Sequence, residues 1–359
     1  MVVMIDIDGS YGEGGGQILR TSVSLSALTM KPVRITNIRA GRRNPGLRRQ
    51  HMAGIELTGQ LVDAYVKGLE VGSTEIEFVP RTRQSGEFSY DVGTAGSISL
   101  ILQAVLPPAV LSPEPVSFRL RGGTDVAWSP PIDYIRNLFV NVLHQMGPRV
   151  EIVQHRRGHY PRGGGSVSCE IIPVKTIQPL NLVQFGELQY VNGISHCVKL
   201  PSHVADRQAL SVESTLAEHD METEHIVRES YPKNKDSHLG PGSGIVIWAE
   251  SRDGIRLGAD KLGERGKRAE LVGAESAQHL LSELSTEMAI DSHLSDMLVP
   301  YLAIATGRSR IGVTKITSHL KTNIWVVERI LGLKMVLEGR IGSPGILTSE
   351  GIGLSFGEG

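Results

Sequence analysis

Three stretches of the sequence share one layout, and this internal repeat limits what the chain can fold into. Each stretch begins with an alternating, β-branched strand, at Val33–Arg39, Val116–Arg121 and Ile311–Thr317. A polar loop and then a helical pattern follow each strand, and the layout recurs at a spacing of roughly eighty residues. Crossovers of this kind pack helices on sheets, which predicts an α/β (α+β) protein.

Further elements complete each copy. A Gly or Leu-Gly break after each helix leads to two strands that we expect to pair. The helices expected before the three repeated strands are Gly14–Leu28, Gly93–Leu106 and His293–Ala305. The expected strand pairs are Thr74–Val79 with Phe88–Val92, Arg149–Gln154 with Ser166–Ile172, and Lys334–Gly339 with Gly345–Ser349. One copy therefore reads strand–helix–strand–helix–strand–strand. General α/β patterning explains a match between any two copies, but three copies in order weaken that explanation.

The pattern changes between residues 186 and 280. Strands at Leu188–Leu200 and Gly244–Glu250, with helices at Val204–His219 and Lys267–Leu284, predict a small inserted α/β domain. The predicted domains are residues 1–185 with the first two copies, residues 186–280 as the insertion, and residues 281–359 with the third copy.

Composition narrows the class of protein. The chain is 40% hydrophobic and 21% charged, as soluble globular proteins are, and it contains no apolar run long enough to span a membrane. Its N-terminus lacks the basic flank and apolar stretch of a signal peptide. Cys169 and Cys197 are too few for a disulfide framework. We therefore expect buried thiols and a cytoplasmic protein.

The arginines are unevenly distributed, although a formal net charge of −1 gives no general argument for nucleic-acid binding. Five arginines fall within Arg39–Arg49 and three within Arg156–Arg162. Charge runs are usually solvated loops. The alternative is a phosphate-binding surface, because guanidinium forks match phosphate oxygens.

One histidine lies where ligands gather in α/β folds. His319 follows the strand Ile311–Thr317 and precedes the helical pattern Thr322–Leu331. The loops at Arg39–Arg42 and Thr124–Asp125 take the same position in the other two copies, at the carboxyl end of a strand. A helix N-terminus beside His319 suits a phosphate, and an imidazole there can attack a nucleotide phosphate.

Six blocks of sequence carry a resemblance to a known family. They are Gly9–Arg20 (GSYGEGGGQILR), Ile38–His51 (IRAGR…PGLRRQH), Gly93–Pro107 (GTAGSISLILQAVLP), Arg121–Pro131 (RGGTD…PP), His159–Gly165 (HYPRGGG) and Ser318–Glu328 (SHLKTNIWVVE). In this order they resemble the catalytic type of RNA 3′-terminal phosphate cyclase, over nearly the whole chain. The resemblance implies three repeated units of two helices on a four-stranded sheet, with a small inserted domain. It also implies that ATP drives conversion of an RNA 3′-phosphate to a 2′,3′-cyclic phosphate.

The mechanism that the resemblance implies centres on His319. This residue corresponds to the family's nucleophile, which attacks the α-phosphorus of ATP and gives histidine–AMP and pyrophosphate. AMP then passes to the RNA 3′-phosphate, and the neighbouring 2′-OH displaces it. A covalent intermediate splits one difficult step into easier ones.

The resemblance also implies roles for other residues. Glu13 would lie near Mg²⁺ (or Mn²⁺) and the triphosphate, since Mg²⁺ takes one or two carboxylates together with phosphate oxygens. The residues expected to bind the phosphates and the RNA end are Arg20, Arg39, Arg42 and Gln50. The residues expected at the nucleotide are Gln103, Pro130 or Pro131, His293, Leu294, Ser295, Asp296 and Met297, with Asp296 at the ribose. Well-known members carry Tyr-x-x-Asp-Gln where this chain has His293-x-x-Asp296-Met297, which leaves base recognition open.

Two other functions stay open at this point. A non-catalytic relative acts as a ribosome-assembly factor, but such relatives lack the histidine that corresponds to His319. Enolpyruvyl transferases resemble the family in their repeated fold units, and a likeness of fold alone does not assign a function. The sequence does not decide the physiological RNA, the preferred metal, whether GTP replaces ATP, or whether the chain forms a homo-oligomer.

Overall fold

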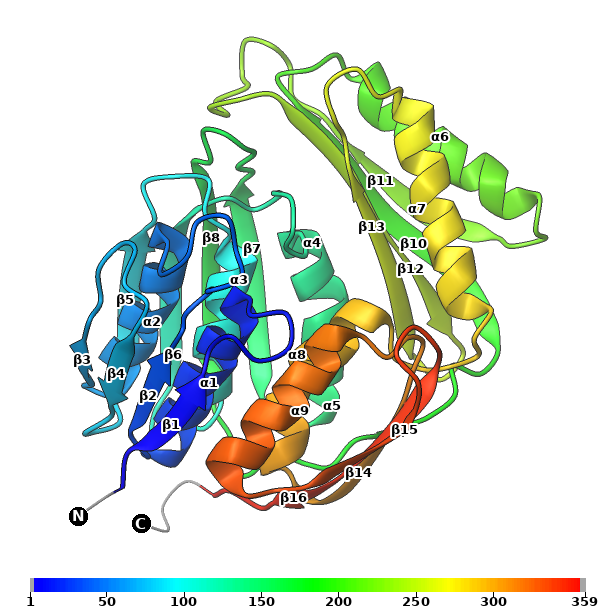
Figure 1. Ribbon diagram of the computed structural model, residues 1–359. Helices are drawn as coiled ribbons and strands as arrows, with labels where there is room; N and C mark the ends of the chain where they lie inside the picture. The colour runs from blue at the N-terminus through cyan, green and yellow to red at the C-terminus, as the bar shows by residue number, and fades with distance from the viewer. Residues whose placement is uncertain (1–2, 356–359) are drawn as a thin grey trace.

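The computed structural model describes residues 3–355 and shows a mixed α/β protein whose strands form four-stranded sheets (Figure 1). The predicted α/β class is confirmed. Among the described residues, no helix is both long and apolar enough to cross a membrane.

The first sheet comes from the N-terminal part of the chain. Its strands are β1 (Ile5–Asp8), β2 (Val33–Thr36), β3 (Tyr65–Lys67) and β4 (Ile76–Val79), and its helices are α1 (Gly16–Thr29) and α2 (Arg49–Leu61). The strands lie in the order β1-β2-β4-β3, with β1 and β2 parallel. Alternate residues of β2 and β4 are buried, because one face of this sheet covers the helices.

The second sheet follows directly along the chain. Its strands are β5 (Gly86–Asp91), β6 (Val116–Gly122), β7 (Arg149–Arg156) and β8 (Gly165–Ile172), in the order β5-β6-β8-β7. Its helices are α3 (Ile98–Ala109) and a continuous segment made of α4 (Ile132–Tyr134), the π-helical turn η1 (Ile135–Phe139) and α5 (Val140–Gln145). The antiparallel pairing of β7 with β8 confirms the strand pair predicted there.

The predicted pairing of Thr74–Val79 with Phe88–Val92 is wrong. Strand β4 pairs with β2 and β3 inside the first sheet, whereas β5 starts the second sheet and runs parallel to β6. Alternation of buried and exposed residues identifies a strand but not its partner. The short strand β3, which the sequence pattern did not reveal, takes the place beside β4.

The third sheet joins the C-terminal part of the chain to a short earlier strand. Its strands are β9 (Asn181–Leu182), β14 (Thr306–Val313), β15 (Met335–Gly339) and β16 (Gly345–Ile352), and its helices are α8 (Ser292–Ile304) and α9 (Ser318–Leu331). The order is β15-β16-β14-β9, with β9 parallel to β14. The predicted pairing of the two last strands is confirmed.

The strand and helix around His319 have different bounds from those predicted. Strand β14 ends at Val313, and α9 begins at Ser318 and not at Thr322. The hydroxyl of Thr317 accepts a hydrogen bond from the backbone N–H of Leu320 at 2.8 Å, which caps the helix early. His319 therefore lies in the first turn of α9.

The fourth sheet is made by the chain between β9 and α8. Its strands are β10 (Leu188–Val198), β11 (Thr223–Glu229), β12 (Gly242–Ser251) and β13 (Arg256–Leu262), and its helices are α6 (His203–Ala217) and α7 (Ala269–Leu284). The order is β11-β10-β12-β13. Helices α6 and α7 pack against the strands on the outer side (Figure 1). On the other face, Gly258 of β13 lies against Leu138 and Tyr134, which belong to the helical segment of the second sheet.

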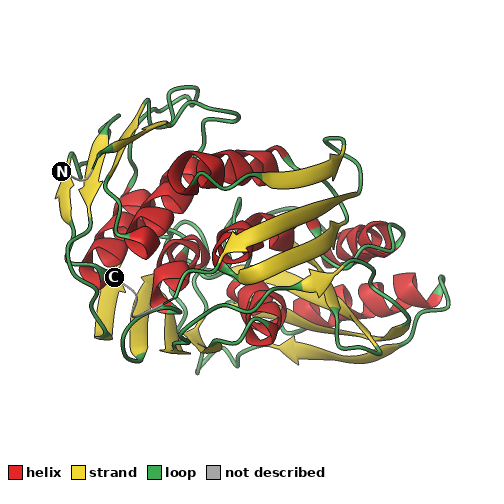
Figure 2. Cartoon of the chain, turned by 90° about the horizontal axis from the view of Figure 1, so that it is seen from below, coloured by secondary structure: helices red, strands yellow, loops and turns green. Residues whose placement is uncertain are grey.

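Helices from three sheets meet in the middle of the molecule. Helix α1 packs on α3 and α9, and α8 packs on α3 and α9. Figure 2 shows these helices between the strands near the N-terminus and those near the C-terminus. Their facing side chains are buried, among them Leu25, Leu102, Leu298 and Val327. This packing brings the first turns of α1 and α9 together.

The close approach of β14 to the segment that precedes the fourth sheet gives a stability prediction. A Cβ on Gly312 would collide with the carbonyl of Val183 and lie 2.8 Å from the sulfur of Met288. Because a backbone carbonyl must shift, we expect Gly312→Ala to lower the free energy of unfolding by about 1–3 kcal/mol. Gly59→Ala is the control: its Cβ meets atoms at 3.7 Å inside α2 and should stabilise by about 0.5–1 kcal/mol. Denaturant unfolding measures both, and equal stability of the two variants would contradict this packing.

Candidate active site

The backbone around His319 is fixed by polar contacts from α8. Thr317, the N-cap residue of α9, donates its hydroxyl to Oδ1 of Asp296 at 2.7 Å. One turn further, Nδ2 of Asn323 donates to the backbone carbonyl of Asp296 at 2.6 Å, and Thr21 of α1 donates to Oδ1 of Asn323 at 2.7 Å. Three helices thereby share one buried polar network under the first turn of α9.

The imidazole of His319 is held by a single residue of α1. Oε1 of Gln17 contacts Nδ1 of the ring, and Nε2 of Gln17 donates to the backbone carbonyl of His319 at 3.2 Å. The hydrogen bond to the backbone carbonyl of His319 orients the amide group of Gln17. The amide oxygen, Oε1, therefore faces the ring, and it can only accept a hydrogen bond. Because the partner of one ring nitrogen sets the tautomer, the proton lies on Nδ1 and Nε2 keeps its lone pair.

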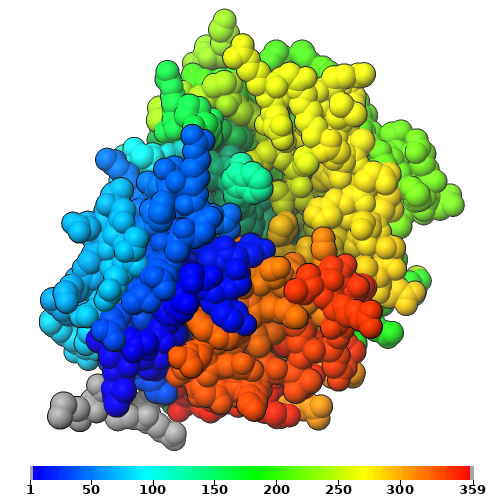
Figure 3. All heavy atoms as spheres, viewed as in Figure 1, coloured from blue at the N-terminus to red at the C-terminus, as the bar shows by residue number. Residues whose placement is uncertain are grey.

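The other ring nitrogen, Nε2, faces the glycine-rich loop that precedes α1. Nε2 of His319 lies 3.2 Å from Oε2 of Glu13, and a guanidinium nitrogen of Arg42 lies 3.9 Å from the same oxygen. The side chains of all three are between 42% and 48% exposed, so this group opens to solvent. In Figure 3 the blue N-terminal segment lies against the orange segment that holds α8 and α9, and the surface is hollowed above that contact.

Two further contacts hold this loop on α9. The rings of Tyr11 and Trp325 stack with centroids 4.0 Å apart and an angle of 8° between planes. Gly12, at a φ of +60°, has room only for hydrogen, since a Cβ would lie 2.6 Å from Oγ1 of Thr322. These contacts keep Glu13 beside His319.

Positive charge surrounds the site, and it shifts the pKa values of the histidines. Burial, Arg20 and Arg42 lower the pKa of His319 below its usual value of 6.5, while Glu13 acts in the opposite direction. Burial and the nearby arginines also lower the pKa of His51 to about 3. Both rings are therefore neutral at neutral pH.

Gln17 and His51 were not among the residues that the sequence analysis assigned to the site. The ring of His51 accepts a hydrogen bond at Nδ1 from the backbone of Arg48, at 3.1 Å, and its Nε2 lies against Gly16. Both residues stand inside blocks that carry the family resemblance. Their position in these blocks was the signal that could have identified them. By residue type alone, a glutamine and a histidine at the start of a helix look like ordinary packing residues.

The four residues predicted to bind the phosphates and the RNA end differ in their surroundings. Arg20 is near Gly16 and stays cationic, although burial lowers its pKa to about 10. One guanidinium nitrogen of Arg39, Nη1, donates to two carbonyls of its own loop, those of Asn44 and Gly46, at 2.9 Å each. Gln50 is half-buried at the start of α2, against Gly96. Arg42 is the exposed member beside Glu13.

The predicted nucleotide-pocket residues do not all reach the surface. Their positions fall into two groups. Gln103, Pro130 and Asp296 are half-buried and His293 is exposed, whereas Pro131, Leu294, Ser295 and Met297 are buried. Asp291 caps α8 by accepting from the backbone N–H of His293 at 3.0 Å, and the His293 ring meets Tyr134 edge to face at 6.0 Å between centroids. Burial raises the pKa of Asp296 to about 8, so at neutral pH this carboxyl can donate as well as accept a hydrogen bond.

Comparison with known proteins identifies the family of the chain. The family model for RNA 3′-terminal phosphate cyclase matches residues 11–337. The chain belongs to the RNA 3′-terminal phosphate cyclase family. It is 52% identical over 350 residues to a protein of that name from Ignicoccus hospitalis, covering 97% of this chain and 99% of the relative. It is also 52% identical over 341 residues to one from Methanopyrus kandleri, covering 95% and 97%.

The comparison with solved structures adds no argument about function. The enolpyruvyl transferase NikO from Streptomyces tendae aligns with 99% of this chain and 49% of its own, at 10% identity and a TM-score of 0.37. A likeness this weak does not support the enolpyruvyl transferase alternative, and membership of the cyclase family stands against it.

The charges around His319 predict opposite pKa changes for two substitutions. Glu13 raises the pKa of the imidazole and Arg42 lowers it. We therefore expect Glu13→Gln to move the titration midpoint of His319 to lower pH and Arg42→Gln to move it to higher pH, with the wild-type midpoint below 6.5. Histidine NMR titration, with the signal assigned by its loss in His319→Ala, measures all three. Shifts of the same sign in both variants would contradict the arrangement.

The role of Gln17 in fixing the tautomer gives a second prediction. Gln17→Met keeps the length of the side chain but removes the amide, so the imidazole should become a mixture of tautomers. Nitrogen-15 NMR of histidine-labelled protein distinguishes the two ring nitrogens. We expect the Nδ1–H form to dominate in the wild type and in the control Gln60→Met, an exposed position on α2. A mixture already present in the wild type would be evidence against the role of Gln17.

Proposed function

We propose that this protein converts an RNA 3′-terminal phosphate to a 2′,3′-cyclic phosphodiester with ATP, through a covalent AMP on His319. The observation that carries the proposal is the imidazole at the N-terminus of α9, whose Nδ1 is held by Gln17 and whose Nε2 faces the exposed carboxylate of Glu13 at 3.2 Å. Burial lowers the pKa of this ring, which favours its neutral form. A neutral nitrogen with a fixed lone pair is the form that a nucleophile needs. Membership of the family supports cyclisation as the reaction.

The proposed reaction has three balanced steps. Nε2 of His319 attacks the α-phosphorus of ATP, a P–N bond forms, and the bond to the β-phosphate oxygen breaks to release pyrophosphate. An oxygen of the RNA 3′-phosphate then attacks the same phosphorus, and the P–N bond breaks. Finally the 2′-OH attacks the RNA phosphorus, AMP leaves, and the hydroxyl proton passes to solvent. The middle step turns a poor leaving group into a good one.

The charges of the site suit a polyphosphate. Arg20 and Arg42 offer guanidinium groups to phosphate oxygens, and the N-terminus of α9 adds free N–H groups. Glu13 is one exposed carboxylate beside them, which fits the demand of Mg²⁺ or Mn²⁺ for a carboxylate together with phosphate oxygens. Such an ion would neutralise charge on the leaving pyrophosphate. Arg39 and Gln50 are proposed for the RNA end.

The nucleoside is proposed to lie toward α8. We assign the half-buried carboxyl of Asp296 to a ribose hydroxyl and the exposed ring of His293 to stacking on adenine. Pro130 and Gln103 belong to sequence blocks that resemble the family, and they are proposed for the same nucleotide. Leu294, Ser295 and Met297 are buried, so we assign them to the packing that supports these groups.

We also propose that the chain is built from three repeated units and one insertion. The support is the element order, in which β1-α1-β2-α2-β3-β4 recurs as β5-α3-β6-(α4, η1, α5)-β7-β8. The third unit would be β9 followed by α8-β14-α9-β15-β16, interrupted by the fourth sheet. On this proposal the insertion occupies residues 186–280, between residues 1–185 and 281–359.

Covalent labelling tests the proposed function. We expect the wild type with ATP labelled at the α-phosphate and a divalent metal to retain one label per chain after denaturation, and to cyclise 3′-phosphate RNA. His319→Ala should lose both activities. His144→Ala is the control, a histidine of α5 whose ring bonds the backbone of Val150, and it should keep both. Label retained by His319→Ala at the wild-type level would refute the mechanism, and a labelled wild type without cyclisation would refute the substrate.

A further inference from the structure

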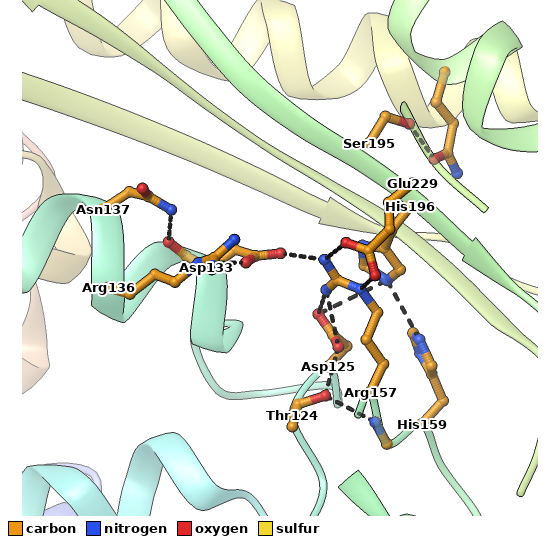
Figure 4. A network of polar contacts seen from close by, with 12 residues as sticks. Thr124, Asp125, Asp133, Arg136, Asn137, Arg157, His159, Ser195, His196 and Glu229 are labelled. Carbon is orange, nitrogen blue, oxygen red and sulfur yellow. Dashed lines mark hydrogen bonds and ion pairs between the residues drawn. The ribbon is translucent and has the colours of Figure 1, made fainter. Parts of the chain in front are cut away.

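A second group of ionisable residues lies where the second sheet meets the fourth, and it shares no residue with the His319 group. Asp125 comes from the loop after β6, His159 from the loop after β7, and His196 from β10 (Figure 4). Arg157 contacts Asp125 and links this group to Asp133 and Glu229. The side chains of Asp125, His159, His196 and Arg157 are at most 7% exposed.

The three possible ligand atoms converge on one point. Nε2 of His159 lies 3.3 Å from Nε2 of His196, which lies 3.8 Å from Oδ1 of Asp125. All three atoms are within 4.8 Å of one another. A tetrahedral zinc ion with bonds of about 2.0–2.1 Å separates its ligand atoms by about 3.3–3.4 Å. Figure 4 shows the two imidazoles facing each other.

The carboxylates around this group outnumber the guanidinium groups, which favours a bound cation. Arg157 donates to Asp133 at 2.7 Å and to Glu229 at 2.6 Å, and reaches Asp125 only at 3.3 Å. Arg136 pairs with Asp133 at 2.9 Å. Three carboxylates thus meet two guanidinium groups.

The surroundings orient the possible ligands. Oδ2 of Asp125 accepts the hydroxyl of Thr124 at 2.6 Å. Oδ1 accepts from Arg157 at 3.3 Å and also faces Nε2 of His196 at 3.8 Å. Strand β12 makes space for both rings with glycines. A Cβ on Gly242 would collide with the His159 ring, and one on Gly244 would lie 2.9 Å from Cε1 of His196.

We propose that Asp125, His159 and His196 form a binding site for a divalent transition-metal ion, and that zinc is the ion it takes. Two imidazoles and one carboxylate suit zinc, whereas magnesium prefers oxygen ligands alone. His196 belongs to the fourth sheet and the other two ligands to the second, so the ion ties the two sheets together. This site is independent of the proposed function.

Metal binding to the full chain tests the proposal. After treatment with a chelator and its removal, zinc should raise the Tm, and cobalt(II) should give the visible absorption of a tetrahedral complex at one equivalent per chain. His159→Gln and His196→Gln should each lose the cobalt spectrum and the zinc-dependent rise in Tm. Two controls should keep both signals: His155→Gln, whose ring bonds Ser168 on the exposed face of β7, and His319→Ala, which tests the other metal-binding group.

Two results would overturn the assignment. One is a chelator-treated wild type whose Tm does not respond to zinc and which gives no cobalt spectrum. The other is full retention of both signals in His159→Gln and His196→Gln. Circular dichroism checks that the variants are folded. If a variant is unfolded, two proteins remain for the test, the wild type and His319→Ala. Both should then show the zinc-dependent rise in Tm and the cobalt spectrum at one equivalent per chain.

Discussion

The contact between Gln17 and His319 is the interaction on which the rest of the site depends. It joins two residues 302 positions apart, one on α1 and one on α9. A glutamine that contacts both the ring and the backbone of one residue fixes position, rotation and tautomer together. The packing of α1 on α9, the cap at Thr317 and the stacking of Tyr11 on Trp325 all serve to keep these two side chains in register. Without that register, Nε2 would have no defined direction.

Electrostatics then decides what the imidazole can do. Burial and the nearby arginines lower the pKa of His319, so in the proposed mechanism the nucleophile needs no added base at neutral pH. The same arginines would attract the polyphosphate that we propose as substrate. Oε2 of Glu13 lies 3.2 Å from Nε2 of the histidine and 3.9 Å from Arg42, and this carboxylate acts to raise the pKa of His319. In the proposed mechanism, one cluster of residues would therefore both set the pKa of the nucleophile and bind its substrate.

The sequence predicted most of the individual helices and strands, but not all of their pairings and bounds. The paired strands 149–154 with 166–172 follow one another closely along the chain, and local alternation was enough to predict their pairing. The pairing of β4 with β2 and β3 was missed because β3 has three residues and too little pattern. The start of α9 was placed late because Thr317, which is β-branched, reads as strand although its hydroxyl caps the helix. Periodicity records side-chain alternation, not hydrogen bonds to a cap.

The site was predicted as a set of residues but not as a geometry. The resemblance to the family supplied His319, Glu13 and Arg42, and the structure brings these three together. It could not show that Gln17 holds the ring, because the contact spans nearly the whole chain. The most direct test is the attachment atom of AMP, identified by phosphorus–nitrogen NMR coupling in labelled protein after reaction with ATP. The account predicts a bond to Nε2 of His319; a bond to Nδ1, or to any other residue, would contradict it.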